Sequence, residues 1–569
     1  MNDPESGNPD SPVWTSGKTD IYHTGTWRSA VPDYVNPPAP CHSACPVDGN
    51  IALWIQQIKE GDYHGAWHTL TGNNPFPAIA GRICHHPCES VCNRGRYDEP
   101  VSICALERFV GDLAIREKWS LPPVPCSKKE SIAVIGAGPA GLSAAYHLRR
   151  RGYAVVLLEA KAELGGLMRY GIPPYRLAKD VLDWEIQRII GLGMEVRLGT
   201  AIRSRNELEA LAGEFDVIYL AMGADTPKRL PSLDYSKEWV LDGAEYLARS
   251  NEAEVSRIGR RVVVIGGGSA AMDVARSAKR HDREITILCL EPEALLPCQE
   301  EELVDSREEG IRLITGAMLQ SVSEIRGCLT LSCIRLDFLP GSRRGEFTIQ
   351  PIPDTEFVIE ADTIISSIGQ DPAPHLLDGM LDRNGALVKI DAHMQTSRTG
   401  IFAGGDLATM ERFVTHAIGM GKAAAAEIHS YLYPDEVPMD MKQINRYLRT
   451  PRTSATRDRN ADVTMDAINL YYHERLARNN QPRVPVAERL QNFNEIQTNF
   501  SHQQASEESG RCFSCGNCIF CNNCFNYCPD MAIVKLDLGY EVRLDYCKGC
   551  GLCVRECPTA AIAMFEDRQ

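Results

Sequence analysis

The chain has 569 residues, enough for roughly three or four domains with large cores. Its hydrophobic share of 44% and charged share of 24% are ordinary for a globular protein outside membranes. The 60 basic and 75 acidic residues leave a net charge of −15, so nothing favours nucleic acid or an anionic membrane as a partner. No apolar run approaches the ~18 residues of a membrane span, and the N-terminus lacks an apolar signal core, so we expect a cytoplasmic protein without membrane insertion.

The sequence pattern changes several times along the chain, and each change suggests a domain boundary. Helical patterns such as IALWIQQIKEGDYHGAWHTL (51–70) dominate the first part, without a convincing strand. From Ser131 to about Pro434, short β-branched runs alternate with helices, which indicates parallel α/β layers. In chain order, the predicted segments are an extended N-terminal arm (1–40), a helical cysteine-bearing domain (41–126), the first part of a nucleotide-binding domain (127–240), a second nucleotide-binding domain (241–370), the remainder of the first (371–434), a polar connector (435–505) and a cysteine-rich C-terminal domain (506–569).

A strand–turn–helix motif opens the α/β part of the chain. IAVIGAGPAGLSAAYHL (132–148) contains a GxGxxG turn, and the second strand ends in an acid, Glu159. Glycines permit a tight turn close to a pyrophosphate at the helix N-terminus, and the acid accepts a ribose hydroxyl. A glycine-rich turn without a ligand is disfavoured because strand, helix and acid fall in register. The predicted dinucleotide contacts are Gly136, Gly138, Pro139, Ala140, Gly141 and Glu159.

The same design recurs in RRVVVIGGGSAAMDVARSAK (260–279), followed by a second strand and the segment CLEPE (289–293). This repetition predicts a second dinucleotide site. Its expected contacts are Gly266, Gly268, Ser269, Ala270 and Glu291.

Two nucleotide folds, with the second inserted in the first, resemble the pyridine-nucleotide disulfide-reductase architecture. The late motif of that family is matched by TSRTGIFAGGDLATMERFVTHAIGMGKAAA (396–425). The resemblance implies FAD in the first fold and NAD(P) in the second. It also implies that Gly405 and Asp406 contact the flavin, and that the following helix directs its N-terminus at the isoalloxazine. No CxxC lies near either motif, so a redox disulfide is not expected.

A closer resemblance is to the small subunit of glutamate synthase and the N-terminal half of dihydropyrimidine dehydrogenase. ELGGLMRYGIPPYRL (163–177) looks like the flavin-flanking signature of that group, which adds Gly166 and Arg176 to the expected FAD contacts. GRICHHPCESVCNRG (81–95) resembles its cysteine motif. The likeness covers residues 41 to about 432.

One departure from that group concerns the choice of nucleotide. Relatives that use NADPH place paired arginines just after the second strand of the nucleotide fold, whereas this chain has Leu290 and Glu291 there. A carboxylate repels a 2′-phosphate and accepts hydrogen bonds from a free diol, so NADH is favoured. The alternative is a phosphate site supplied by Lys279, Arg280 and His281 at the helix end.

Cysteines are concentrated in two regions. Of the 21, six lie between Cys41 and Cys104 and ten between Cys512 and Cys557. Clustered CxxC spacing in a long chain without a signal peptide indicates metal ligation. The cysteines interpreted as small buried hydrophobes are Cys104, Cys126, Cys289, Cys298, Cys328 and Cys333.

The C-terminal cysteines form two copies of the bacterial ferredoxin run C-x₂-C-x₂-C-x₃-C-P, in which the fourth cysteine ligates the other cluster. This predicts a ferredoxin-like α+β domain with two [4Fe–4S] clusters. Zinc is the less favoured alternative, because both runs are complete. One predicted ligand set is Cys518, Cys521, Cys524 and Cys557; the other is Cys547, Cys550, Cys553 and Cys528.

The helical domain is less complete. The resemblance to the glutamate synthase group implies two cubanes there, one held by three cysteines and a Gln or Glu side chain. Matching the motifs gives that cluster Cys45, Cys84, Cys88 and Glu107. The other cluster retains only Cys41 and Cys92, since residues 1–40 contain no cysteine.

ASEESGRCFSCGNC (505–518) resembles the segment that carries the missing CxxC pair in relatives, and the ferredoxin runs leave Cys512 and Cys515 unused. Our hypothesis is that this pair folds back to complete the cluster of Cys41 and Cys92. The alternative is a vestigial site with structural thiols. The chain would accordingly hold three or four [4Fe–4S] clusters.

The resemblance implies an oxidoreductase subunit that moves electrons between NAD(P)H, FAD, the clusters and a partner. No side chain need act as acid or base, so no catalytic residue is nominated. Expected partners within a hetero-oligomer are a 2-oxoacid or aryl-oxoacid:acceptor oxidoreductase, a reductase of aromatic thioesters or sulfite, or ferredoxin. An NADPH-dependent glutamate synthase small subunit is the alternative, although such subunits lack a ferredoxin tail. A non-enzymatic iron–sulfur scaffold or redox sensor is disfavoured by the intact Glu159 and Asp406.

Overall fold

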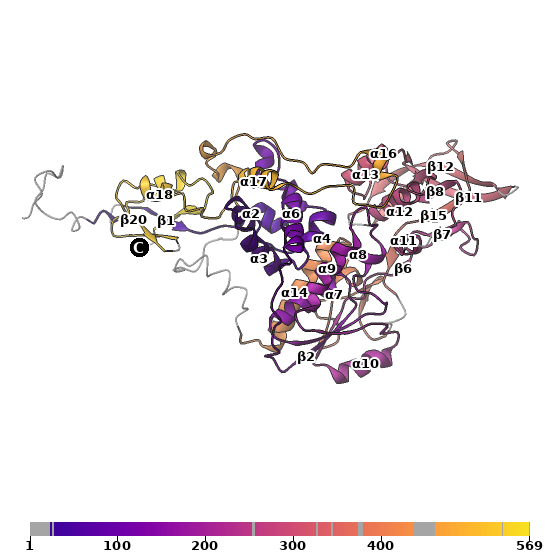
Figure 1. Cartoon of the computed structure of the whole chain (residues 1–569), viewed down its shortest axis with the longest axis horizontal. Helices are drawn as coiled ribbons and strands as arrows, with labels where there is room; N and C mark the ends of the chain where they lie inside the picture. Colours follow the sequence, from indigo (N-terminus) through magenta and orange to yellow (C-terminus); the bar gives the residue numbers. More distant parts are fainter. Residues whose placement is uncertain are drawn as a thin grey trace, which may run out of the picture.

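The computed structural model describes residues 23–25, 28–252, 257–325, 328–342, 345–373, 379–436, 461–537 and 539–567. Residues 1–22 of the predicted arm and 437–460 of the predicted connector therefore lie outside the described residues. Figure 1 shows an elongated molecule with the C-terminal cysteine-rich part at one end and the second nucleotide fold at the other. The first nucleotide fold projects from the middle, below the N-terminal helices. Among the described residues, no helix is both long and apolar enough to cross a membrane.

The N-terminal cysteines lie in a bundle of short helices. These are α1 (Pro40–Ala44), α2 (Ile51–Lys59), α3 (Tyr63–Asn73), α4 (Pro77–Ile83), α5 (Pro87–Ser90) and α6 (Ile103–Arg116), with the 3₁₀ turn η3 (Asn93–Arg96). Helices α4 and α6 cross closely, because a Cβ at Gly81 would lie 2.3 Å from the backbone N of Arg108, and one at Gly111 would lie 2.3 Å from that of Ala78. Only glycine permits this crossing, which places the end of α4 beside the middle of α6.

The first nucleotide fold is a five-stranded parallel sheet in the order β19-β5-β2-β3-β4. Its last strand in the sequence, β19, arrives about 180 residues after β5, and the second fold occupies that interval. The strands are β2 (Ser131–Ile135), β3 (Ala154–Leu158), β4 (Glu195–Arg197), β5 (Val217–Leu220) and β19 (Ile401–Ala403). The accompanying helices are α7 (Pro139–Arg150), α8 (Leu167–Tyr170), α9 (Lys179–Ile190), α10 (Arg205–Glu214) and α14 (Val414–Leu432).

The second nucleotide fold is also a five-stranded parallel sheet, in the order β10-β9-β8-β15-β7. Four antiparallel strands, β11 to β14, pack against it, with β12 paired to the other three. The parallel strands are β7 (Val240–Asp242), β8 (Arg261–Ile265), β9 (Glu284–Leu288), β10 (Arg312–Ile314) and β15 (Thr363–Ser366). The antiparallel strands are β11 (Ala317–Ile325), β12 (Cys328–Pro340), β13 (Phe347–Pro351) and β14 (Phe357–Ala361), and the helices are α11 (Gly243–Asn251), α12 (Ser269–Lys279) and α13 (Glu300–Glu308).

Short elements complete the nucleotide-binding part. They are β6 (Thr226–Pro227), β16 (Gln370–Asp371), β17 (Arg383–Asn384) and β18 (Leu387–Val388), with the 3₁₀ turns η4 (Glu293–Leu295) and η6 (Gly405–Leu407). The two nested parallel sheets agree with the predicted disulfide-reductase-like α/β architecture.

The C-terminal part is a small α+β unit of two helical turns and two strand pairs. Its elements are α18 (Asn523–Asn526), β20 (Ile533–Leu536), β21 (Gly539–Val542), α19 (Leu552–Arg555) and β22 (Ile562–Glu566). Strand β22 pairs antiparallel with β1 (Ala30–Tyr34), so the two ends of the chain share one sheet (Figure 1). Before this unit lie η7 (Met465–Ala467), η8 (Leu470–Tyr472), α16 (Val486–Arg489) and α17 (His502–Gly510).

Candidate functional site

The first glycine-rich turn leaves room for a phosphate-bearing ligand. Gly136 has a φ of +101°, and a Cβ there would lie 2.4 Å from the carbonyl oxygen of Ala221. The next glycine, Gly138, caps α7, and a Cβ on it would have a single neighbour within 4 Å, the Cα of Gly166 at 4.0 Å. Gly138 and Gly166 therefore approach each other at the N-terminus of α7. The resulting concave backbone fits the pyrophosphate of FAD.

Glu159 lies at the end of β3, where the motif predicts a ribose acceptor. The side chain is buried, and its carboxylate accepts hydrogen bonds from the backbone N–H of Ala137 (2.8 Å) and of Lys161 (2.9 Å). A carboxylate has about four lone-pair sites, so two bonds leave capacity for a hydroxyl. The Glu159 carboxylate is thus fixed over the turn and can still accept a hydrogen bond from a ribose hydroxyl.

The Gly-Asp motif returns to this turn from the end of the fold. A Cβ on Gly405 would lie 3.0 Å from the Cβ of Ala140, at the start of α7. The neighbouring Asp406 is half-buried, and burial raises the pKa of its carboxyl to about 6, against the opposing effect of Arg412. Asp406 and the turn at Gly138 therefore belong to one site, as a shared flavin would require.

Helix α14 joins the flavin motif to the N-terminal cysteines. The Cys84 thiol donates to Thr415 Oγ1 in the first turn of α14 (3.6 Å), and the His85 ring stacks on Phe413 with centroids 3.9 Å apart. A Cβ on Gly419 would lie 2.0 Å from the Pro46 carbonyl oxygen, so the helix also contacts the segment after Cys45. The end of α14 expected to face the flavin is thus in direct contact with a cysteine of the helical domain.

The second glycine-rich turn is open to solvent. Nothing lies within 4 Å of a Cβ built on Gly268, which caps α12 ahead of Ser269 and Ala270. Glu291 lies over the turn, with its Oε2 3.0 Å from a Cβ built on Gly267, and burial raises the pKa of its carboxyl. The acid and the helix N-terminus therefore face the same space.

Arg176 joins the two nucleotide folds. Its guanidinium pairs with Asp273 of α12 and Glu302 of α13, both at 2.7 Å. Burial raises the pKa of Asp273 to about 6, and the Arg176 charge opposes this rise. The side chain predicted to flank the flavin thus forms part of the joint between the folds.

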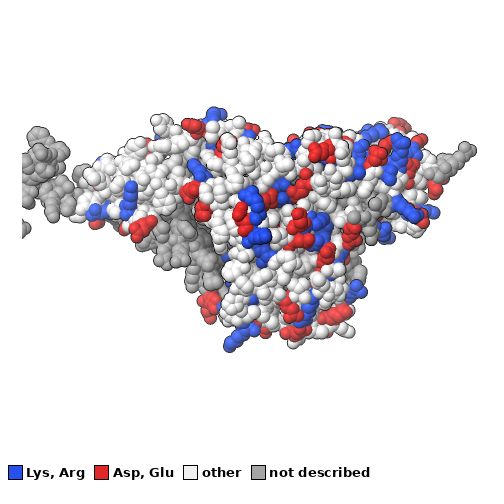
Figure 2. All heavy atoms as spheres, in the orientation of Figure 1, with Lys and Arg blue, Asp and Glu red and all other residues white. Residues whose placement is uncertain are grey.

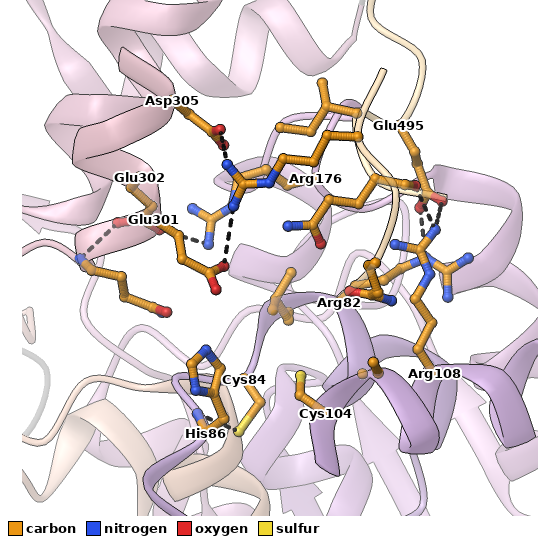
Figure 3. A pocket seen from close by; sticks show the side chains of 18 of the residues that line it. Arg82, Cys84, His86, Cys104, Arg108, Arg176, Glu301, Glu302, Asp305 and Glu495 are labelled. Carbon is orange, nitrogen blue, oxygen red and sulfur yellow. Dashed lines mark hydrogen bonds and ion pairs between the residues drawn. The ribbon is translucent and has the colours of Figure 1, made fainter. Parts of the chain in front are cut away.

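A cavity of about 360 Å³ lies where the helical domain, both nucleotide folds and the segment before α17 meet. Figure 3 shows Cys84 and Cys104 on one wall and the carboxylates of α13 on the opposite wall. At one side, Arg82 and Arg108 of the helical domain pair with Glu495 at 2.6 and 2.7 Å. Ion pairs therefore join the four parts around this cavity.

The first N-terminal cysteine set comes together from four separate helices. Cys45 follows α1, Cys84 caps α4, and Cys88 and Glu107 lie on α5 and α6. Burial, together with the nearby Glu107 and Cys45, raises the pKa of the Cys84 thiol to about 12. Asn74 donates to Glu107 Oε1 at 2.8 Å, and burial raises the pKa of this carboxyl to about 7. Three thiols and a carboxylate therefore share one buried space.

The second N-terminal set combines cysteines from the two ends of the chain. Burial raises the pKa of the Cys41 thiol well above its usual value, and the negative charges of the adjacent Cys512, Cys92 and Cys515 raise it further. Asn93 Nδ2 donates to Cys515 Sγ at 3.5 Å. The structure therefore brings together the four thiols of the sequence hypothesis.

The C-terminal cysteines gather as two sets of four. Burial, together with the nearby Cys524, Cys557 and Cys521, raises the pKa of the Cys518 thiol to about 11. The other set lines a single hollow, formed by Cys528, Cys547, Cys550 and Cys553 together with Pro32 of the N-terminal strand. Each group contains the four cysteines that the ferredoxin spacing assigns to one cluster, including the fourth cysteine of the other run.

The spacing of these side chains bears on whether they would hold a single metal ion or a larger cluster. Within the described ranges, no three His, Cys, Asp or Glu side chains are arranged to hold a metal ion. A [4Fe–4S] cube is larger than an ion and takes one thiolate at each of four corners. Four cysteines around a shared buried space have the donor chemistry that such a cluster needs.

Sequence reasoning missed several side chains that contact these sets. Tyr34 donates to Cys524 Sγ at 3.2 Å, from a strand 490 positions earlier in the chain. Asn74, Asn93 and Thr415 likewise contact cysteine or carboxylate groups distant in sequence. Hydrogen bonds to cluster sulfurs tune reduction potential, so these residues bear on function. No local motif could reveal them, because each contact is made through tertiary structure.

Comparison with known families covers most of the chain. Residues 130–421 match the pyridine nucleotide-disulphide oxidoreductase family, residues 36–119 match dihydropyrimidine dehydrogenase domain II with a 4Fe-4S cluster, and residues 517–562 match a 4Fe-4S dicluster domain. These matches support the expected fold, with an N-terminal iron–sulfur domain and a C-terminal ferredoxin-like domain.

Three relatives illustrate the likeness. The NADP(+)-dependent formate dehydrogenase subunit beta of Moorella thermoacetica is 30% identical over 84% of this chain and 70% of its own length. The NADPH-Fe(3+) oxidoreductase subunit beta of Geobacter sulfurreducens is 29% identical, over 84% and 75%. A homolog of the NAD-dependent dihydropyrimidine dehydrogenase subunit PreT from Salmonella typhi is 31% identical, over 69% and 91%. The chain therefore belongs to the pyridine nucleotide-disulphide oxidoreductase family, as an NAD(P)H-dependent iron–sulfur flavoprotein oxidoreductase.

Proposed function

We propose that this chain is the electron-transfer subunit of a larger enzyme and connects NAD(P)H, through FAD and [4Fe–4S] clusters, with a partner subunit or ferredoxin. When bound, these cofactors supply the hydride and single-electron chemistry that no side chain here provides. The proposal rests on the positions of the cysteine sets. They begin with Cys84, which contacts the first turn of α14, and end with Cys550, which is exposed. The chain's own role is to hold, space and shield the carriers.

Contacts between neighbouring sets support a continuous route. Cys84 touches α14 beside the flavin motif. Burial raises the pKa of the Cys88 thiol, and Cys41 of the other N-terminal set is close enough to add to the rise. At the far end, burial raises the pKa of the Cys553 thiol, and Cys524 of the other ferredoxin set adds to it. The cysteine sets therefore adjoin one another in space, although their order along the chain is different.

The surroundings of Glu291 favour NADH. Its carboxylate lies over the second glycine turn, where it would repel a 2′-phosphate. Arg280, one of the three residues of the alternative phosphate site, is buried and engaged with Glu309 through two hydrogen bonds of 3.0 Å. Arg276 binds the same carboxylate. Because both arginines are engaged with Glu309, they favour the alternative phosphate site at the end of α12 less.

The C-terminal unit is the proposed docking surface for a partner. Cys521 and Cys550 are exposed there. Figure 2 shows few charged atoms on the visible face of this end, in contrast to the mixed charges over the rest. The exposed large apolar side chains of this unit are Phe520, Phe525, Tyr527, Met531, Leu536, Leu544 and Leu552. Such a concentration is typical of an interaction surface.

The partner class is proposed from what the chain contains. Its matched segments bind nucleotides or iron–sulfur clusters, and the named relatives are subunits. We therefore favour a cytoplasmic hetero-oligomer in which another chain binds the substrate. A 2-oxoacid or aryl-oxoacid:acceptor oxidoreductase, another reductase, and free ferredoxin are the partner classes to test, with a glutamate synthase large subunit as the alternative.

Anaerobic reduction of a viologen dye by the purified holoprotein tests the proposal. We expect bound FAD, dye reduction with NADH, and a lower kcat/KM with NADPH. Glu291→Gln should lower kcat/KM for NADH by about tenfold, the effect of losing one charged hydrogen bond, and should narrow the difference between the nucleotides. Absence of both flavin and dye reduction would contradict the electron-transfer role. A tenfold preference for NADPH would contradict only the choice of nucleotide.

A further inference from the structure

The segment just before the ferredoxin run is built into the N-terminal domain. Phe500 and Ala505 are buried in the same apolar core as Trp54 and Leu106. Glu508 and Ser509, further along α17, are also fully buried. The chain thus returns to its first domain immediately before Cys512, some 400 residues after leaving it.

A buried ion network fixes this return. Arg511 pairs with Glu508 at 2.6 Å and with Asp98 at 3.1 Å, and donates to the Glu99 carbonyl at 2.7 Å. Glu508 in turn accepts from the backbone N–H of Ser102 at 2.8 Å. Buried charges persist only when they are well paired, so the network holds residue 511 in one position against the segment after Cys92.

The two cysteines that follow are oriented by contacts to the same domain. Asn93, next to Cys92, donates to Cys515 Sγ at 3.5 Å. Ser514 donates its backbone N–H to Cys512 Sγ (3.4 Å), and its hydroxyl donates to Gln56 of α2 (3.3 Å). Cys41, Cys92 and Cys512 pack against one apolar core. The two tail cysteines are therefore held against the part of the N-terminal domain that carries Cys92, and Cys41 is close enough to all three of these thiols to interact with them electrostatically.

No other assignment uses these thiols. The matched N-terminal iron–sulfur family ends at residue 119, and the matched dicluster domain begins at residue 517, after Cys515. The ferredoxin spacing consumes the remaining eight C-terminal cysteines. Residues 1–40 contain no cysteine, so no CxxC pair precedes Cys41 to complete its set with Cys92. Each half of the set is thus incomplete without the other.

We propose that Cys512 and Cys515 complete a [4Fe–4S] site with Cys41 and Cys92, so that the two ends of the chain hold one cluster jointly. The inference deepens the proposed electron-transfer function and rests on it for the role of the site. A consequence for assembly is that this cluster forms only after residue 515 has been made and has docked.

The position of the site makes it the link between the body and the tail. Cys515 precedes Cys518 of the first ferredoxin set by three residues. The turn between them is held by a hydrogen bond from the Gly516 N–H to the Thr559 carbonyl (2.6 Å), and the Thr559 hydroxyl lies 3.6 Å from Cys557 Sγ. On the other side, Cys41 adjoins the set of Cys88. Electrons from the flavin would pass this site on the way to the tail.

Iron content and EPR of a Cys512→Ser/Cys515→Ser holoprotein test the shared site. We expect a loss of about four irons per chain, with the C-terminal cluster signals retained. Cys41→Ser should give the same iron content. Cys126→Ser, at an exposed cysteine outside all four sets, should leave the iron content unchanged. Full iron content in the double variant would overturn the proposal.

Cysteine alkylation of the unaltered chain tests the site without relying on a variant that folds. In the iron-loaded protein, Cys512 and Cys515 should resist iodoacetamide as strongly as Cys41 and Cys92 do, and all four should become reactive together when a chelator removes iron. Rapid labelling of Cys512 and Cys515 while Cys41 and Cys92 stay protected would overturn the proposal.

Electron transfer in the double variant distinguishes the shared cluster site from the proposed electron-transfer function on which it rests. NADH should still reduce the flavin, while reduction of the C-terminal clusters, followed by EPR, should slow by about an order of magnitude or more because the link is lost. If the unaltered chain transfers no electrons from either nucleotide, the proposed function fails, and iron counting still decides whether the site is shared.

Discussion

The two cysteine-rich regions of this chain reach similar ends by different means. In the C-terminal unit, the eight predicted ligands come from two short runs with the same spacing, and only the fourth cysteine of each is assigned to the other set. In the N-terminal domain, single residues from α1, α4, α5 and α6 converge, and the tail brings two more thiols close to Cys41. A local motif is therefore nearly sufficient for the first kind of site, whereas the second depends on correct helix packing.

Breaking the buried ion network should have the largest effect and should separate the two regions. Glu508→Ala leaves Arg511 buried without its nearest carboxylate and also removes acceptors for the backbone N–H groups of Ser102 and Asn479. Loss of one partner of a buried pair costs about 3–5 kcal/mol. We expect a lower unfolding temperature and loss of the tail-completed cluster. Glu507→Ala, at an exposed position on the same helix, is the matched control. Equal effects of the two variants would show that the network is not needed.

Iron removal should distinguish the regions by exposure. Cys521 and Cys550 are exposed, whereas the cysteines of the N-terminal sets are half-buried or buried. A chelator should therefore extract iron first from the C-terminal unit, by about an order of magnitude in rate. Time-resolved alkylation with mass spectrometry would show which cysteines react first. Earlier release of iron from the N-terminal sets would contradict the expectation that burial protects them.

Widening the α4–α6 crossing should damage only the N-terminal sets. A Cβ at Gly81 would meet the Arg108 backbone at 2.3 Å, so Gly81→Ala must push the helices apart and with them Cys84 and Glu107. Overpacking of this kind costs about 1–3 kcal/mol. Denaturation and iron analysis should show lower stability and fewer N-terminal clusters. Gly72→Ala on α3 is the control, because nothing lies within 4 Å of its added Cβ. An unchanged iron content in Gly81→Ala would argue against a packing-dependent site.

Removing a single hydrogen bond should produce the smallest effect, a shift in potential without loss of iron. Tyr34→Phe deletes the O–H that donates to Cys524 Sγ. Because such bonds stabilise the reduced cluster, its midpoint potential should fall by about tens of millivolts in a redox titration monitored by EPR. Tyr540→Phe removes a neighbouring hydroxyl that donates to Asn522 instead of to sulfur, and should leave the potential in place. A matching shift in both variants would assign the effect to general polarity.

The agreement between sequence and structure differs in kind across the molecule. The nested nucleotide folds follow from local patterns, since strand, glycine turn, helix and acid lie within about 30 residues of each other. The ferredoxin sets follow from spacing for the same reason. By contrast, nothing local in the sequence indicates that Arg280 is occupied by Glu309, or that Tyr34 reaches Cys524.

The sequence by itself determined which chemistry the chain can hold, because glycine turns and CxxC runs carry their own geometry. Only the tertiary structure decided how these parts are connected. The return of α17 to the first domain, with Arg511 and Glu508 buried against the Cys92 segment, brings Cys512 and Cys515 to Cys41 from the far end of the chain. The physical reason is that such a meeting depends on the burial of apolar surface and paired charge between segments more than 400 residues apart, which no short window of sequence contains.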